Sequence, residues 1–167
     1  MTQNKMLRPE FTRALAARLL QGASINLTAP HGLGRRRTVQ DLRSVLPQGM
    51  PVLHADMKSS AADFPSTLSG LCAQAGLKDK DTANLGQLIE SLGQDPVPAL
   101  LILHNVDLLK NAPHDPLFDT ALLPYLARIA EYPHLALLCI SEAIYADWPL
   151  PCEHLPLPPK AGDIARI

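Results

Sequence analysis

The sequence predicts an α/β fold, a three-layer sandwich in which helices cover both faces of a mainly parallel sheet. Segments with strand character alternate along the chain with segments of helical periodicity. Residues 98–106 (PALLILHNV) and 134–141 (HLALLCIS) are nearly continuous apolar runs, as expected of central parallel strands covered on both faces. A hydrophobic fraction of 47% over 167 residues can close one core without disulfides or metal ions, so residues 1–167 are expected to form a single domain.

The first part of the chain predicts a helix, a strand, a turn and a second helix. Residues 9–21 place apolar side chains at helical spacing, between a proline suited to a first turn and a glycine suited to a stop. Residues 24–28 (SINLT) are short and β-prone, and glycine-containing turn residues separate them from helical periodicity over 35–45. Residues 51–57 (PVLHADM) are expected to form the second strand.

The remaining elements are expected to continue this alternation. Helices are predicted over residues 65–75, 85–92 and 119–131, and in the last of these Pro124 either kinks the helix or marks its first turn. A short fifth strand is predicted at residues 154–157. Parallel sheets of this kind bind ligands at the carboxyl ends of their strands, so candidate site residues are expected there.

Composition argues against several classes of function. The formal net charge is −1 and the aromatic content is 4%, so the chain has neither a global basic field nor many base-stacking platforms for nucleic acid. No apolar stretch reaches the roughly 20 residues of a membrane-spanning helix, and the N-terminus has no signal-peptide character. Cys72, Cys139 and Cys152 are widely spaced and odd in number, which favours buried thiols in a reducing compartment. We therefore expect a cytoplasmic protein without membrane contacts.

The turn after the first strand has the ingredients of a phosphate-binding loop, namely glycines where the backbone turns and a helix N-terminus behind them. In the full pattern, G-x-x-x-x-G-K-[ST], the lysine neutralises the outer phosphates and the hydroxyl group binds magnesium. Here Ala29 replaces the first glycine, Arg35 the lysine and Arg36 the hydroxyl residue. The candidate phosphate loop comprises Ala29, His31, Gly32, Leu33, Gly34, Arg35, Arg36 and Arg37.

The order of these segments resembles the core of AAA+ and STAND P-loop NTPases over most of the chain. Residues 11–46 resemble the N-terminal part of that core, and residues 98–109 resemble its Walker B strand. Ser141 resembles the polar sensor that follows the next strand, and residues 155–159 resemble the strand that leaves the core in STAND proteins. The resemblance implies a P-loop NTPase-like sheet. Because the chain stops soon afterwards, we expect it to lack the helical lid domain.

The positions that carry out hydrolysis in this family are altered. The resemblance implies an Asp that holds the magnesium shell and a Glu that polarises the attacking water, and this chain has His104 and Asn105 there. A neutral imidazole is a poor ligand for magnesium, and an amide cannot accept a proton from water as a general base does. Asp107, where many family members are also acidic, is the only nearby carboxylate that the predicted arrangement offers.

These departures predict a pseudo-ATPase that serves as a protein-interaction or assembly module, with a protein partner or a homo-oligomer as its contacts. No residue is assigned as catalytic or as a metal ligand. An alternative is a nucleotide-binding or weakly active ATPase that uses Arg35 and Asp107, with ATP or ADP as its cofactor. A second alternative is a DNA-associated accessory protein that binds through the three consecutive arginines, although composition makes nucleic acid the less favoured partner.

Each candidate residue also has an interpretation without a ligand. The three arginines either bind phosphate or form a solvated helix N-terminus, and both interpretations stay open because cations there oppose the helix dipole unless an anion compensates. His31, His54 and His104 can meet at the carboxyl edge of the sheet, but their spacing matches no metal motif, so unrelated roles are favoured. Ser141 contacts phosphate or caps a following helix, and Trp148 closes the core or anchors a partner.

Overall fold

The computed structural model contains, within its described residues, one sheet of five strands. These residues are 6–30, 32–60, 63–76, 85–111, 113, 115–142, 150 and 152–158. The strands are β1 (Ser24–Thr28), β2 (Val52–Asp56), β3 (Ala99–His104), β4 (Leu135–Ser141) and β5 (Glu153–Pro156). They lie in the order β2-β3-β4-β1-β5, and each neighbouring pair is parallel. All the predicted strands are therefore confirmed.

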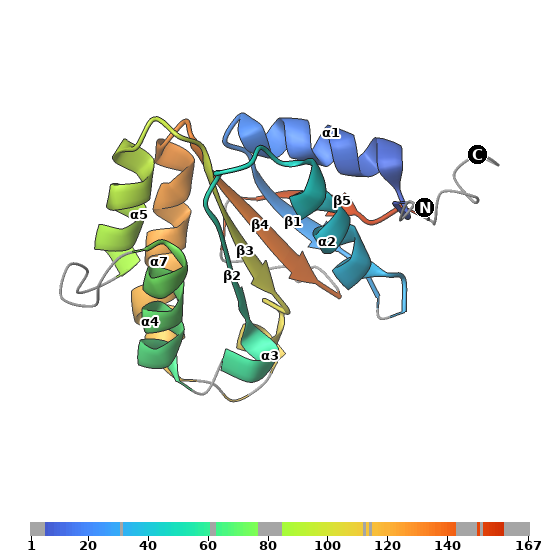
Figure 1. The fold of residues 1–167 in the computed structure, drawn as a ribbon. Helices are drawn as coiled ribbons and strands as arrows, with labels where there is room; N and C mark the ends of the chain where they lie inside the picture. Colours follow the sequence, from blue (N-terminus) through green and yellow to red (C-terminus); the bar gives the residue numbers. More distant parts are fainter. Residues whose placement is uncertain are drawn as a thin grey trace.

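Helices cover both faces of this sheet, which confirms the predicted three-layer α/β sandwich. Figure 1 shows α1 and α2 on one face, with α4, α5 and α7 on the other. A helical lid is not evident in the described residues, and none of their helices is long and apolar enough to cross a membrane. The helices are α1 (Pro9–Leu20), α2 (Arg35–Val45), α3 (Met57–Ser60), α4 (Phe64–Gln74), α5 (Leu85–Gln94), α6 (Leu108–Asn111) and α7 (Leu123–Leu126).

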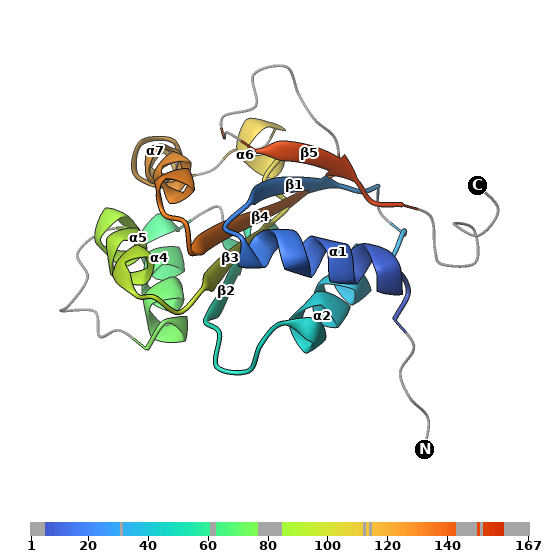
Figure 2. The same cartoon turned by 90° about the horizontal axis from the view of Figure 1, so that it is seen from above.

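An apolar layer forms on each face of the sheet, because successive side chains of a strand point to opposite faces. In β3, Leu101 and Leu103 join the layer under α4, α5 and α7, while Leu100 and Ile102 join the layer under α1 and α2. The view in Figure 2 shows α1 and α2 side by side over this second layer. β3 and β4 are buried along their length except at His104, as predicted for central strands.

The cysteines contribute to packing, as the sequence predicts for buried thiols. Cys72 and Cys139 are buried, and Cys152 is half-buried against the apolar layer that contains Cys139. A hydrogen bond with Cys152, together with burial, raises the pKa of the Cys139 thiol well above its ordinary value. Cys139 is therefore a protonated, unreactive thiol at neutral pH.

The segment predicted as one helix over residues 119–131 is helical but not a regular α-helix. A π-helical turn, η2 (Phe118–Leu122), precedes α7, and a 3₁₀ turn, η3 (Ala127–Glu131), follows it. Pro124 lies in the first turn of α7, one of its two expected places, where its missing N–H removes no necessary helix hydrogen bond. Phe118 in the π turn packs edge-on against Phe64 of α4, with the ring centroids 5.3 Å apart.

β2 is an edge strand whose outer backbone is covered at one residue by a side chain. The Gln74 side chain of α4 accepts a hydrogen bond from the His54 N–H at 2.8 Å and donates one to the His54 carbonyl at 3.0 Å. An amide placed in this way imitates the backbone of a neighbouring strand. The centre of this edge is therefore closed to pairing with another chain.

Candidate functional site

The candidate site lies at the carboxyl end of the sheet, where the β1–α2 loop leads into α2. The Ala29 N–H donates to the Ser141 carbonyl at 2.8 Å, which extends the pairing of β1 with β4 beyond the end of β1. Gly32 and Gly34 have φ angles of 87° and 78°, in the left-handed region that favours glycine. At Gly34, a Cβ atom would also lie 2.7 Å from the Leu7 Cδ1 atom. Both glycines of the predicted phosphate loop are therefore required by its backbone.

Arg8, which the sequence does not single out, holds this loop in place. Its side chain is 0% exposed, and it donates hydrogen bonds to the Leu33 carbonyl at 2.7 Å and to the Thr38 hydroxyl oxygen at 2.9 Å. A third hydrogen bond, from Nε to the Pro158 carbonyl, spans 2.5 Å. One planar guanidinium thus joins the start of α1, the β1–α2 loop, α2 and the segment after β5.

Arg35, the first residue of α2, points back into the protein. Only 9% of the residue is exposed. Its Nη1 donates to the Ala29 carbonyl at 3.2 Å, and its Nη2 donates to the Asn105 Oδ1 at 2.8 Å. The guanidinium therefore ties the loop to the end of β3, and its N–H groups are directed at protein acceptors.

Asn105 is the centre of a hydrogen-bonded chain across the ends of β3 and β2. It is buried, its φ angle is 59°, and Asn is one of the few residues besides glycine that adopts this conformation readily. While Oδ1 accepts from Arg35, its Nδ2 donates to the Asp56 Oδ1 at 2.7 Å. Both ends of the amide are thus used inside the protein.

Asp56 corrects the expectation that Asp107 is the only carboxylate near the site. It ends β2, directly beside His104 in the register of the sheet. Its Oδ1 also accepts from the Lys58 N–H at 2.9 Å, and its Oδ2 lies 3.5 Å from the Arg36 guanidinium. The carboxylate that faces the site is therefore already surrounded by protein donors.

The three consecutive arginines have three different environments. Arg35 is internal, and Arg37 forms an ion pair of 3.0 Å with Asp41, four residues along α2. Only Arg36 is largely solvated, because its side chain is 76% exposed and its ion pair with Asp56 is long. Arg36 lines, with Gly32, Arg35, Lys58 and Asn105, a cavity of about 260 Å³ in front of the loop.

His104 ends β3 with its side chain half-buried. Burial lowers the pKa of His104 below its ordinary value of 6.5; Asp56 opposes this shift, whereas His54, Arg36 and Arg35 add to it. The imidazole is therefore neutral near pH 7. No group of three or more possible metal ligands occurs within the described part of the chain, which does not include His31.

Asp107 and Ser141 are not among the residues that line the cavity. Asp107 is turned toward the end of β4, where its Oδ2 accepts from the Glu142 N–H at 3.4 Å, and its Oδ1 has no hydrogen-bond partner among the described residues. Ser141 is buried and donates to the Asn26 Oδ1 at 3.0 Å. The helix that Ser141 was expected to cap, like Trp148, lies outside the described residues.

Comparisons with known proteins find similarity in the fold and not in the sequence. No family model and no curated protein matches the chain. Among solved structures, the ORC2 protein of Aeropyrum pernix, in ADPNP–ADP complexes, aligns over 93% of this chain and 49% of its own, with a TM-score of 0.61 and 14% identity. The chain has a P-loop NTPase fold.

Two further structures have the same P-loop NTPase fold. A Walker-type ATPase of Pyrococcus abyssi aligns over 93% of this chain and 56% of its own, with a TM-score of 0.56 and 13% identity. Drosophila ORC bound to AT-rich DNA and Cdc6 aligns over 81% of this chain and 46% of its own, with a TM-score of 0.56 and 18% identity. The chain thus spans about half the length of the proteins it matches, and at these identities the similarity establishes the fold alone.

Proposed function

We propose that the domain is a catalytically inactive, ATPase-like module that acts through contacts with a protein partner or with further copies of itself. One observation carries the proposal. Asn105, at the position of the family's general base, is hydrogen-bonded on one side to Arg35 and on the other to Asp56. These groups hold the loop to the sheet, and neither an amide nor a guanidinium takes a proton from water at neutral pH.

The residues around the cavity also do not fit the magnesium ion that P-loop hydrolysis requires. Magnesium prefers oxygen ligands, whereas the strand ends here offer the His104 imidazole and the Asn105 amide, whose oxygen already accepts from Arg35. The Asp56 carboxylate accepts hydrogen bonds from Asn105 and Lys58 and pairs with Arg36. Binding a metal ion would require these contacts to break first.

Phosphate release from radiolabelled ATP with magnesium, measured at high protein concentration, tests the proposal. We expect no release above the buffer control, and no difference among the wild type, Arg35→Ala and Asp56→Asn. Turnover by the wild type that Arg35→Ala abolishes would overturn the proposal. Analytical ultracentrifugation of the same sample measures whether the contacts include self-association.

A second candidate, a domain that holds a phosphate-bearing ligand without metal, is favoured by the cations around the cavity. Arg35, Arg36 and Lys58 line it together with Gly32. Three cations can supply the charge compensation that magnesium provides elsewhere. The DNA alternative has less support, since Arg35 is buried and Arg37 is paired with Asp41.

Thermal unfolding with ATP or ADP separates these candidates. A ligand at about 100 times its dissociation constant stabilises a fold by roughly 2.7 kcal/mol, which is readily visible. Binding without metal predicts an equal shift with magnesium and with chelator, and loss of the shift in Lys58→Gln. A shift that requires magnesium would instead support an active ATPase, and no shift would leave protein contacts as the function.

A further inference from the structure

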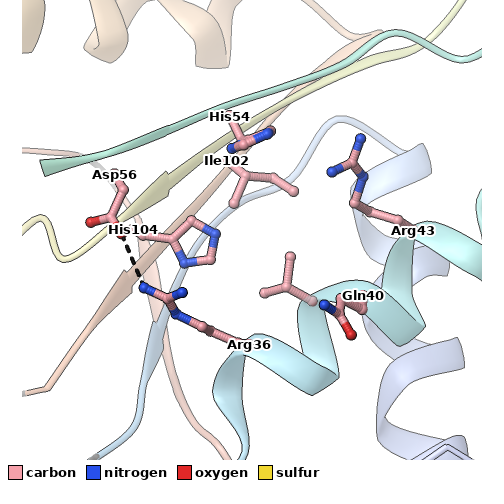
Figure 3. Close-up of a pocket in the computed structure, with 8 residues that line it drawn as sticks. Arg36, Gln40, Arg43, His54, Asp56, Ile102 and His104 are labelled. Carbon is pink, nitrogen blue, oxygen red and sulfur yellow. Dashed lines mark ion pairs between the residues drawn. The ribbon is translucent and has the colours of Figure 1, made fainter. Parts of the chain in front are cut away.

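A second hollow lies between α2 and the ends of β2 and β3, beside the cavity in front of the β1–α2 loop. This α2–β2 groove has a volume of about 250 Å³ and is drawn in Figure 3. One wall is the exposed face of α2, which presents Arg36, Gln40 and Arg43 at helical spacing. The opposite wall presents His54 of β2 and His104 of β3. The groove exists because α2 leaves these parts of the two strands uncovered.

Two of the three polar side chains that α2 presents to this groove have no partner among the described residues. Arg43 is exposed and has no ion-pair or hydrogen-bond partner among the described residues, and the same holds for the Gln40 amide. Arg36 has one long ion pair, with an Asp56 carboxylate that other donors already satisfy. The side chains that line the groove include two guanidinium groups, those of Arg36 and Arg43, against one carboxylate, that of Asp56. The charge of the groove therefore complements an anionic ligand.

The floor of the groove is apolar and its rim is open. Val39 and Ile102, both buried, form the floor between the two polar walls. Because Val39 is 6% exposed and Ile102 is 0% exposed, the floor offers a ligand little apolar surface, and recognition depends on the charged walls. Among the described residues, no Phe, Tyr or Trp lines the groove, so these residues offer no platform for stacking nucleic-acid bases.

The adjoining strand edge limits how a partner can bind. Gln74 occupies the outer N–H and carbonyl of His54, at the centre of β2. A partner that adds a strand to β2 would have to displace this side chain. Recognition at this side of the sheet must therefore come from side chains in the groove.

We propose that the α2–β2 groove binds an acidic segment of a partner protein, whose carboxylates pair with Arg36 and Arg43. This inference rests on the proposed function, because it names the chemistry of the protein partner. Guanidinium groups match carboxylates with paired hydrogen bonds, and the two arginines stand one at each end of the groove wall. The charged contacts supply the specificity.

A selection from a library of random displayed peptides tests the proposal, with the wild-type domain as target and Arg43→Glu as the counter-target. Arg43 is exposed and is not among the residues that line the cavity in front of the β1–α2 loop. We therefore expect its replacement to leave the fold and that cavity unchanged. We expect the selected peptides to be rich in glutamate or aspartate. Selection of basic or uncharged peptides, or of none, would overturn the proposal.

The selected peptide is then titrated against three proteins. Arg43→Glu is expected to weaken binding at least about tenfold, as the loss of a charge-assisted contact implies, and added salt should weaken it further. Arg13→Glu, the same change at an exposed site on α1, is expected to leave binding within about twofold of the wild type. Equal binding to all three proteins would refute the proposal.

Nuclear magnetic resonance of the complex locates the ligand and distinguishes a nucleic acid from a peptide. The peptide should shift the amide signals of Gln40, Arg43 and His54, whereas an oligothymidylate should not. Groove shifts with the oligonucleotide alone would replace the proposal with nucleic-acid binding. Phosphate release is measured separately, so a domain that hydrolyses ATP yet selects acidic peptides would overturn only the proposed lack of catalysis.

Discussion

Replacing Arg8 with methionine removes the guanidinium that joins the start of α1 and the segment after β5 to the β1–α2 loop. The wild-type side chain donates to the Leu33 and Pro158 carbonyls and to the Thr38 hydroxyl, and it is 0% exposed. Methionine fills a similar volume and donates no hydrogen bond. The two carbonyl groups would therefore lose their donor while remaining partly buried.

The expected loss of stability follows from these contacts. A hydrogen bond to a charged group contributes about 1.5–3 kcal/mol, so three of them amount to roughly 4.5–9 kcal/mol before opposing effects. Burying the Arg8 charge itself costs several kcal/mol, and methionine avoids that cost, which offsets part of the sum. We therefore expect Arg8→Met to lower the free energy of unfolding by about 3 kcal/mol, a large part of the roughly 5–15 kcal/mol typical of a domain.

Urea unfolding followed by circular dichroism measures this difference. Arg13→Met, the same exchange at an exposed position of α1, is the matched control and should change stability by no more than about 0.5 kcal/mol. Arg8→Lys should fall between the two, because one ammonium cannot reach three separated acceptors as a planar guanidinium does. If Arg8→Met and Arg13→Met unfold at the same urea concentration, the three hydrogen bonds do not hold the loop.

The remaining predictions concern the loop, the strand edge and the site histidine. Gly32→Ala and Gly34→Ala should each lower the free energy of unfolding by about 1–2 kcal/mol in urea unfolding, because both positions have positive φ; unchanged stability in either variant would contradict this backbone conformation. Gln74→Ala should speed hydrogen exchange of the His54 amide at least about tenfold, and an unchanged rate would show that the cap is absent in solution. In nuclear magnetic resonance, His104 should titrate below 6.5, because burial lowers its pKa. The unfolded state then binds the proton more readily than the folded state. The contribution of neutral His104 to the free energy of unfolding is therefore present above about pH 6.5 and is lost as the pH falls. A titration at or above 6.5, or a His104→Gln variant with the same pH dependence of unfolding, would contradict that sign.

Much of the fold could be predicted from the sequence, because the order of strands and helices depends on patterns within short segments. The apolar runs that became β3 and β4, and the glycines that turn the β1–α2 loop, follow from periodicity and backbone sterics alone. The segment 119–131 was harder, since its pattern predicts a helix but does not reveal the π and 3₁₀ turns on either side of α7. Phe118 of the π turn packs against Phe64 of α4, a tertiary contact that local periodicity does not reveal.

Only part of the site could be predicted from the sequence, because its contacts join residues that lie far apart in the chain. Arg8 is an ordinary charged residue until its burial against Pro158, 150 positions away, is known. Asp56 could have been placed at the site from the sequence, because it ends a predicted parallel strand and therefore lies at the same edge of the sheet as His104. For Asn105, the sequence indicates only the loss of a carboxylate; the hydrogen bonds that replace it depend on a φ of 59°.

The central claim is that Arg35 and Asn105 hold the β1–α2 loop to the sheet, and a double-mutant cycle on these two residues tests it most directly. Arg35→Met removes both donors, and Asn105→Gly removes the side chain while accepting the positive φ. The unfolding free energies of the wild type, both single variants and the double variant should give a coupling of about 1–3 kcal/mol. A coupling indistinguishable from zero would mean that the two side chains are not engaged with each other, and would contradict the structural role assigned to Asn105.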